Sequence, residues 1–364
     1  MAVKGKRIEV MADENIPFLK GVLEPYCNVK YLPGRDFPSG NLLYADALLV
    51  RTRTKCDASL LDGSNVSFIA SATIGVDHID IDYLDRRGII YSNAPGCNAC
   101  GVMQYVITSL FYVLSRKKID FRGATLGVIG CGNTGERVAR MAEALGLNVL
   151  RNDPPKGEKT DLETLLEASD IISCHLPLDD STINLIDRHK LALIKDGAIF
   201  INASRGEVVD EKGLMEHVGR FSGLILDVWC GEPDLINSEL LSMCDIATPH
   251  IAGYSYEGKV NGTAAVVGKF AEHFGIDSLK DFVPLHSATP QIEIPWGVFD
   301  KNNSETPYFQ MVDAFSDSLL SIFPLLRTDM KFRESPEKFE SIRNGYDYRR
   351  EFLVPEYISK LNNR

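Results

Sequence analysis

Three charged residues of different types, Arg205, Glu232 and His250, follow short apolar segments in the second half of the chain. An arginine can hold the carboxylate and hydroxyl of a hydroxyacid, and a neutral histidine can take the hydroxyl proton. A carboxylate beside the histidine favours the imidazolium that forms when the proton arrives, which is the role expected of Glu232. Singly, each could instead be a loop contact, a helix cap or a buried histidine. Together they predict oxidation of a 2-hydroxy acid, which also requires a hydride acceptor.

A glycine pattern predicts that hydride acceptor. Residues 130–135 fit G-x-G-x-x-G, follow an apolar segment and open a helical stretch, as in a dinucleotide-binding loop. Gly130 permits the tight turn, Gly132 lets the backbone approach a pyrophosphate, and Gly135 lets helix and strand pack closely. Asp153 ends the next apolar segment, where its carboxylate can bind a ribose diol and would repel a 2'-phosphate. The pattern therefore predicts NAD rather than NADP, although Lys156 adds a positive charge nearby.

Short apolar segments alternate with helical stretches through most of the chain. In the N-terminal part the expected strands are 7–11, 29–31, 47–50, 68–71 and 89–91. After a long helix expected at 101–117, the rhythm restarts with strands at 126–129, 148–150, 171–174, 198–202, 223–227 and 246–248. This alternation predicts an α/β fold with parallel sheets. Polar residues after the later strands predict ligand binding at the carboxyl ends of that sheet.

The composition changes after about residue 285. Pro290 and Pro295 interrupt the chain and aromatic residues become frequent, which indicates a third module. Phe309, Phe315 and Leu319 belong to a stripe at helical spacing. Large exposed aromatic patches are uncommon, so the stripe predicts a buried core or a subunit interface.

Composition also narrows the possible partners. The 364-residue chain has 50 Asp plus Glu against 39 Lys plus Arg, a net charge of -11, so no overall field attracts nucleic acid or an anionic membrane. The longest apolar run, 102–114, contains polar residues and is shorter than a membrane span, and the N-terminus lacks signal-peptide features. The eight cysteines, including the Cys97-x-x-Cys100 pair, show no disulfide or zinc spacing. We therefore expect a cytoplasmic protein without metal, nucleic-acid or membrane partners.

The sequence resembles the D-isomer-specific 2-hydroxyacid dehydrogenases over nearly all of residues 5–280. Beside the glycine pattern, the shared motifs are Asn-Ala-Ser-Arg-Gly at 202–206, Glu-Pro at 232–233 and Pro-His-Ile-Ala-Gly at 249–253. Leu176 departs from the family, where a threonine is usual, and Gln104 stands where an acid is common. Neither departure removes one of the three charged residues.

The resemblance implies a flavodoxin-like substrate-binding domain at 1–96 and 262–285, a Rossmann NAD-binding domain at 97–261, both doubly wound, and a small α+β dimerisation domain at 286–364. The protein would then be a homodimer. Arg205, Glu232 and His250 would be catalytic, and Thr52, Thr73 and Tyr254 would contact the substrate. With the glycine pattern included, the expected NAD contacts are Gly130, Gly132, Asn133, Thr134, Gly135, Asp153, Ala203, Ser204, Arg205, Asp227 and Gly253.

Further motifs, among them 12–17, 72–78 and 250–255, resemble family members that act on a phosphorylated four-carbon acid. The implied reaction is the oxidation of 4-phospho-D-erythronate to 2-oxo-3-hydroxy-4-phosphobutanoate, with NAD as acceptor, in pyridoxal 5'-phosphate (vitamin B6) biosynthesis. One alternative is another substrate of the family, of the phosphoglycerate or glyoxylate/hydroxypyruvate type. A second is a non-enzymatic NAD-binding role, as in corepressors of this fold, and the intact set of three charged residues argues against it.

A phosphorylated acid has two anionic ends, so its site needs donors beyond Arg205, preferably arginines. Each candidate could also be a solvated surface charge. The candidates are Arg35, Arg51, Arg53, Arg349 and Arg350.

Overall fold

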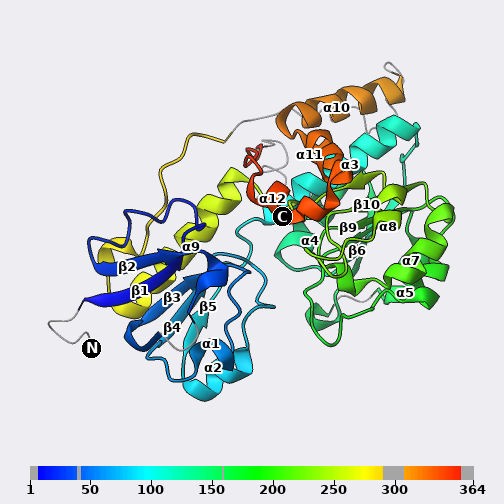
Figure 1. The fold of residues 1–364 in the computed structure, drawn as a ribbon. Helices are drawn as coiled ribbons and strands as arrows, with labels where there is room; N and C mark the ends of the chain where they lie inside the picture. The colour runs from blue at the N-terminus through cyan, green and yellow to red at the C-terminus, as the bar shows by residue number, and fades with distance from the viewer. Residues whose placement is uncertain (1–6, 39–41, 158–159, 290–306, 354–364) are drawn as a thin grey trace. The chain divides into compact units, whose positions relative to one another are not determined.

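The computed structural model describes residues 7–38, 42–157, 160–289 and 307–353 (Figure 1). The chain divides into two compact units, each built from two stretches of sequence. The first unit is Met1–Asn98 with Tyr256–Ala288, and the second is Ala99–Ser255 with Thr289–Arg364. The C-terminal segment is therefore grouped with the second unit.

The first unit contains a parallel sheet of β1 (Ile8–Asp13), β2 (Cys27–Leu32), β3 (Ala47–Val50), β4 (Phe68–Ser71) and β5 (Ile90–Ser92). Its strand order is β2-β1-β3-β4-β5, the flavodoxin order. The sequence-based prediction of a flavodoxin-like α/β sheet is confirmed.

Helices cover both faces of this sheet because its strands are apolar on both sides. Ala47 and Leu49 of β3 pack toward α9 (Tyr256–Phe274), whereas Leu48 and Val50 pack toward α1 (Ala58–Leu61) and α2 (Ile81–Arg87). This alternation follows from the two-residue period of a strand, and continuous apolar strands are typical of parallel sheets buried on both faces.

The second unit contains a parallel sheet in the order β11-β10-β9-β8-β6-β7. The chain runs from β6 to β7 at one edge and then crosses back to β8, on the other side of β6. Ligands bind outside the carboxyl ends of the strands at such a reversal of strand order. The strands are β6 (Thr125–Ile129), β7 (Asn148–Asn152), β8 (Ile171–Cys174), β9 (Ile199–Asn202), β10 (Gly223–Leu226) and β11 (Ile246–Ala247).

Two layers of helices enclose this second sheet. On one face, α3 (Ala99–Lys117) and α4 (Asn133–Ala144) pack on apolar side chains such as Val128 and Ile201. The opposite face is covered by α5 (Leu162–Ala168), α6 (Arg188–Leu193), α7 (Glu211–His217) and α8 (Ser238–Met243).

The C-terminal segment adds α10 (Tyr308–Ile322), α11 (Leu325–Glu334) and α12 (Phe339–Asn344) to the second unit. Helix α10 lies beside α3 (Figure 1), where Phe315 contacts Phe111 at a ring separation of 4.7 Å. Phe315 and Leu319 are buried in the core that α3 shares, so the predicted aromatic stripe is core. Burial of each such side chain contributes roughly 1.5–3 kcal/mol.

Arg349 joins the C-terminal segment to the start of α3 and to the loop after β11. Its buried guanidinium donates to the carbonyl oxygens of Gly101 at 2.6 Å, Ala252 at 2.6 Å and Tyr254 at 2.9 Å. Its carbon Cζ also lies 4.1 Å from the ring centre of Phe323. Arg349 was one of the phosphate candidates from the sequence. These carbonyls take up its two terminal nitrogens, and a contact with phosphate stays a prediction.

Gln104 also anchors this segment. Its side-chain amide donates to the Phe352 carbonyl at 2.7 Å and accepts from the Phe352 N–H at 3.3 Å. The amide can both donate and accept, whereas an ionised acid only accepts. Gln104, which stands where the family commonly has an acid, thus joins helix α3 to Phe352 near the end of the described chain. No helix in the described ranges is both long and apolar enough to cross a membrane.

Candidate active site

The three predicted catalytic residues lie on loops that follow adjacent strands of the second unit. Arg205 comes after β9, Glu232 after β10 and His250 after β11. A hydrogen bond joins Nδ1 of His250 to Oε1 of Glu232. Both side chains remain partly exposed, at 25% for His250 and 19% for Glu232. The structure therefore brings a histidine–carboxylate pair to the carboxyl edge of the sheet, where it can meet a ligand.

The electrostatic environment keeps Glu232 ionised. Burial acts to raise the pKa of Glu232, but the charge and hydrogen bond of His250, the charge of Arg343 and the Trp229 N–H together hold that pKa below its ordinary value. An ionised partner at Nδ1 favours the protonated imidazole once a proton reaches it.

The backbone of His250 is held in an unusual conformation, with φ at 54°. Non-glycine residues seldom occupy this left-handed region, although histidine enters it more readily than most residues. The His250 N–H donates to the Asp227 carbonyl at 2.7 Å, so the chain after β10 fixes the direction of this loop. The strain, of order 1 kcal/mol, persists because the surrounding bonds determine the conformation.

Asp227 organises the loop that carries His250. Its fully buried carboxylate accepts the Thr248 hydroxyl at 2.6 Å, the Ile251 N–H at 2.8 Å and the Ala252 N–H at 2.8 Å. Burial raises the pKa of Asp227 to about 6, although His250 and the three donors act in the opposite direction. Both carboxylate oxygens already accept bonds from the loop, which makes Asp227 a positioning residue for His250. Its expected contact with NAD stays a prediction.

The loop of Arg205 is braced from both sides. Asn202 donates to the Arg205 carbonyl at 2.8 Å and accepts from the Ser204 N–H and hydroxyl at 3.1 and 2.8 Å. At Gly206 an added Cβ would lie 2.2 Å from the carbonyl carbon of Trp229. Only glycine therefore lets the loop after β9 approach the loop after β10 so closely.

Trp229 links the Glu232 loop to the His250 loop and was not among the residues predicted from the sequence. Its indole N–H donates to the Thr248 carbonyl at 2.9 Å, and its backbone N–H donates to Oε2 of Glu232 at 3.2 Å. The ring is buried and meets Phe332 of α11 at a ring separation of 5.5 Å. The C-terminal helices thus support the predicted catalytic loops directly.

The glycine loop has the geometry of a dinucleotide cradle. Gly130 has φ at 85°, and a Cβ on Gly135 would lie 1.9 Å from the Gly130 carbonyl oxygen. A Cβ on Gly132, in contrast, would meet no protein atom within 4 Å, so this backbone faces open space at the start of α4. Helix N-termini of this kind bind anions. The loop therefore fits the pyrophosphate of NAD, and Asn133 and Thr134 form the first turn of α4.

Asp153 is tied to this loop, since its Oδ2 accepts the Cys131 N–H at 2.8 Å. Lys156 donates to the Cys131 carbonyl at 2.7 Å, which places its ammonium on the same loop. The arrangement leaves Asp153 partly exposed beside the glycine turn, where a ribose diol could bind.

Two of the predicted substrate contacts, Thr52 and Thr73, belong to the first unit, where they follow the adjacent strands β3 and β4. The Thr73 hydroxyl lies 2.7 Å from that of Ser71, which is 3.1 Å from Nε2 of His78. His78 therefore has a hydrogen-bonding role in this loop. The third predicted contact, Tyr254, belongs to the second unit together with Arg205, Glu232 and His250.

Tyr254 lies in a cluster that the C-terminal segment completes. The rings of Tyr346 and Tyr348 lie 6.3 and 6.2 Å from its ring, and the Cζ atom of Arg343 lies 5.3 Å from its ring centre. Arg343 was not among the sequence candidates, because no motif surrounds it.

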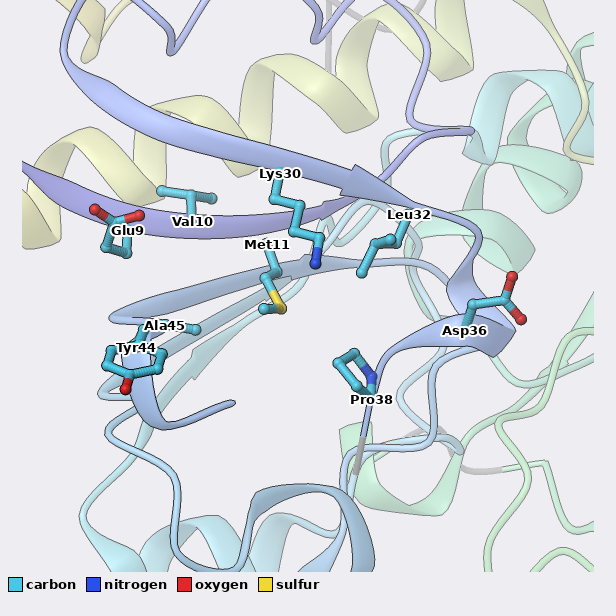
Figure 2. Close-up of a pocket in the computed structure, with 9 residues that line it drawn as sticks. All are labelled: Glu9, Val10, Met11, Lys30, Leu32, Asp36, Pro38, Tyr44 and Ala45. Carbon is cyan, nitrogen blue, oxygen red and sulfur yellow. The ribbon is translucent and has the colours of Figure 1, made fainter. Parts of the chain in front are cut away.

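A separate pocket in the first unit contains none of the predicted site residues. Met11, Lys30 and Leu32 point into it from β1 and β2 (Figure 2). Charged side chains of both signs line this pocket, and its lining includes no histidine. We therefore propose no reaction there. Its other lining residues are Glu9, Val10, Asp36, Pro38, Tyr44 and Ala45. Across the described part of the chain, no group of three or more His, Cys, Asp or Glu side chains is placed to hold a metal ion.

Known proteins show extensive similarity to this chain. Residues 113–252 match the family model of the D-isomer specific 2-hydroxyacid dehydrogenase NAD binding domain. The erythronate-4-phosphate dehydrogenase of Azotobacter vinelandii is 40% identical, with 94% of this chain and 93% of that protein covered. The enzyme of the same name from Bacteroides fragilis is 37% identical, with 94% and 97% covered. This chain belongs to the erythronate-4-phosphate dehydrogenase family.

The fold agrees with that assignment. The crystal structure of Aquifex aeolicus D-lactate dehydrogenase, complexed with NAD and lactic acid, aligns with a TM-score of 0.63 and 26% identity, over 77% of this chain and all of that one. The chain is an NAD-dependent oxidoreductase that acts on CH–OH groups. The predictions of family, α/β fold class and NAD cofactor are confirmed.

Proposed function

We propose that this chain oxidises 4-phospho-D-erythronate to 2-oxo-3-hydroxy-4-phosphobutanoate with NAD, as a step in pyridoxal 5'-phosphate biosynthesis. The observation that carries the chemistry is the hydrogen bond between His250 and Glu232, on loops beside the loop of Arg205. The names of the relatives support the choice of substrate.

His250 is the proton acceptor in this proposal. Its Nδ1 is committed to Glu232, so Nε2 is left to take the proton of the substrate hydroxyl. Glu232 stabilises the imidazolium as that proton arrives. Asp227 and Trp229 hold the loop after β10 and the loop after β11 in position against each other.

Arg205 holds the substrate carboxylate and the reacting oxygen, because a guanidinium can form two parallel hydrogen bonds with oxyanions. Bound NAD supplies the hydride acceptor, held by residues 130–135, Asp153, Gly253 and the loop of Ala203 and Ser204. Thr52, Thr73 and Tyr254 contact the rest of the substrate.

The cellular setting follows the same proposal. The protein acts in the cytoplasm as a homodimer, without nucleic-acid or membrane partners. Its substrate-binding domain is 1–96 with 262–285, and its NAD-binding domain is 97–261. Residues 286–364 form the domain that joins the two subunits. Sedimentation of the purified chain would test the homodimer, and a monomer would contradict it.

Glu232→Gln tests the role of the histidine–carboxylate pair. The amide keeps the shape of the carboxylate but lacks its charge, so it stabilises the imidazolium less. We expect kcat for oxidation to fall by roughly 10- to 100-fold. Glu239→Gln, an exposed change on α8, is the matched control, and a wild-type kcat in Glu232→Gln would contradict the role of the pair.

Asp153→Ala tests the cofactor assignment. Loss of the ribose contact should raise KM for NAD about 10-fold, as expected for one to two hydrogen bonds to a charged group, and leave kcat nearly unchanged. Discrimination against NADP should also relax, because the carboxylate no longer repels the 2'-phosphate. Asp180→Ala, at an exposed position of the same unit, is the control. An unchanged KM for NAD would show that the ribose binds elsewhere.

A further inference from the structure

We propose that Arg343 of the C-terminal segment, with the hydroxyl of Tyr346, forms the subsite for the phosphate group of the substrate, beside the Glu232–His250 pair. This inference rests on the proposed function and extends it to a residue that carries no motif.

The first observation is a buried guanidinium that forms no hydrogen bond or ion pair in the described structure. Arg343 is 9% exposed, and its Nε is buried with no hydrogen-bond partner in the described structure. No carboxylate within that structure forms an ion pair with its guanidinium. Burial of a charged group that lacks hydrogen-bond partners is costly, so such a group is expected where a ligand supplies the missing acceptors.

Two other arginines of the same segment, the half-buried Arg333 and the buried Arg349, provide the contrast. Arg333 donates to Asp329 at 2.9 Å and to the carbonyls of Leu241 and Cys244 at 2.8 and 2.9 Å. Arg349 donates to carbonyls of the site loops at 2.6–2.9 Å. Both arginines therefore bind carbonyl oxygens through their terminal nitrogens, whereas Arg343 forms no side-chain hydrogen bond in the described structure.

The neighbours of Arg343 connect it to the predicted active site. Its Cζ lies 5.3 Å from the ring centre of Tyr254, and its charge acts on Glu232. The ring of Tyr346 lies 6.3 Å from that of Tyr254, and the Tyr346 hydroxyl is also buried without a hydrogen-bond partner in the described part of the chain. A guanidinium and a hydroxyl together can donate several hydrogen bonds to phosphate oxygens.

The length of the substrate sets how far from the reacting carbon its phosphate can bind. Four bonds separate the reacting carbon of 4-phosphoerythronate from its phosphorus, a span of about 5 Å. Tyr254 follows His250 by a single turn of loop, so a group packed on Tyr254 lies close to the reacting centre. Arg205 is assigned to the carboxylate end, so Arg343 is available for the phosphate end.

Phosphate binding can be measured without turnover. Inorganic phosphate should raise the Tm of the NAD-bound full-length wild-type chain, and Arg343→Gln should weaken this response at least 10-fold in phosphate concentration. Arg327→Gln, an exposed arginine of α11, should respond as wild type. A wild-type chain without a response, or an Arg343→Gln variant with a full one, would overturn the subsite.

Stability separates a ligand residue from a structural one. Without phosphate, Arg343→Met should leave the Tm unchanged or raise it, because the unpaired charge is removed. Arg349→Met should lower the Tm by several degrees, because it leaves several carbonyls unsatisfied. A similar loss of Tm in Arg343→Met would make Arg343 a structural residue and overturn the proposal.

Kinetics then separate the phosphate end from the reacting end. Arg343→Gln should raise KM for 4-phosphoerythronate by 10- to 100-fold, while kcat and KM for NAD stay within about twofold of wild type. For Arg343→Lys we expect a KM for 4-phosphoerythronate between those of wild type and Arg343→Gln. A lower kcat with unchanged KM would place its action on Glu232 and overturn the subsite. If wild type shows the phosphate response but does not turn over 4-phosphoerythronate, the substrate proposal fails while the anion site stands.

Discussion

His250→Ala should lower kcat for oxidation by about 10²- to 10⁴-fold, because the group that takes the hydroxyl proton is removed. Affinity for NAD should change little, since the glycine loop and Asp153 are untouched. Stopped-flow or steady-state measurement of NADH formation gives kcat, and tryptophan fluorescence quenching gives the affinity for NAD.

The positive φ of His250 calls for a second variant. Alanine is disfavoured at a φ of 54°, whereas asparagine enters this region readily. His250→Asn should therefore keep the loop and the Tm while kcat remains as low as in His250→Ala. His189→Ala, at an exposed position of α6, should behave as wild type. Full activity in His250→Asn would contradict the assignment of the proton acceptor.

Two glycine substitutions should distinguish the effect of the glycine loop on stability from its effect on NAD binding. In Gly135→Ala the new Cβ would lie 1.9 Å from the carbonyl oxygen of Gly130, so the loop and the start of α4 must move apart. We expect a loss of roughly 2–4 kcal/mol in the free energy of unfolding, together with loss of measurable NAD binding. Urea denaturation and NAD titration would report the two effects.

Gly132→Ala differs because its Cβ meets no protein atom within 4 Å. We expect an unchanged midpoint of urea denaturation and a weakening of NAD binding by about 100-fold, because the methyl group occupies the space that the pyrophosphate needs. Gly219→Ala, also in open space and outside the cradle, is the control. If Gly132→Ala bound NAD as tightly as wild type, the pyrophosphate would not lie on this loop.

Local sequence patterns were sufficient to predict the parallel sheets and the glycine loop. The strands and the glycine loop follow from short-range periodicity, and residues after adjacent parallel strands must share one edge of the sheet. For this reason Glu232 and His250 could be expected to meet, although their sequence spacing alone does not require the hydrogen bond that joins them.

The contribution of the C-terminal segment could not be predicted in the same way. Arg349 reaches Gly101 across most of the chain, and Phe332 packs on Trp229, so both contacts depend on long-range packing. Charged side chains are rarely fully buried, which made a surface arginine the natural expectation at residue 349. Arg343 was missed for the same reason, because only the fold shows that its guanidinium is buried with no hydrogen-bond partner at Nε.

The most direct test of the proposed function is NADH formation by the purified chain with NAD and one of three acids: 4-phosphoerythronate, 3-phosphoglycerate or unphosphorylated erythronate. A 2-oxo acid added in parallel would release the enzyme if bound NADH retains it. We predict selective turnover of 4-phosphoerythronate. Turnover of 3-phosphoglycerate instead would contradict the substrate assignment, and no turnover of any of the three despite NAD binding would contradict the proposed catalytic mechanism.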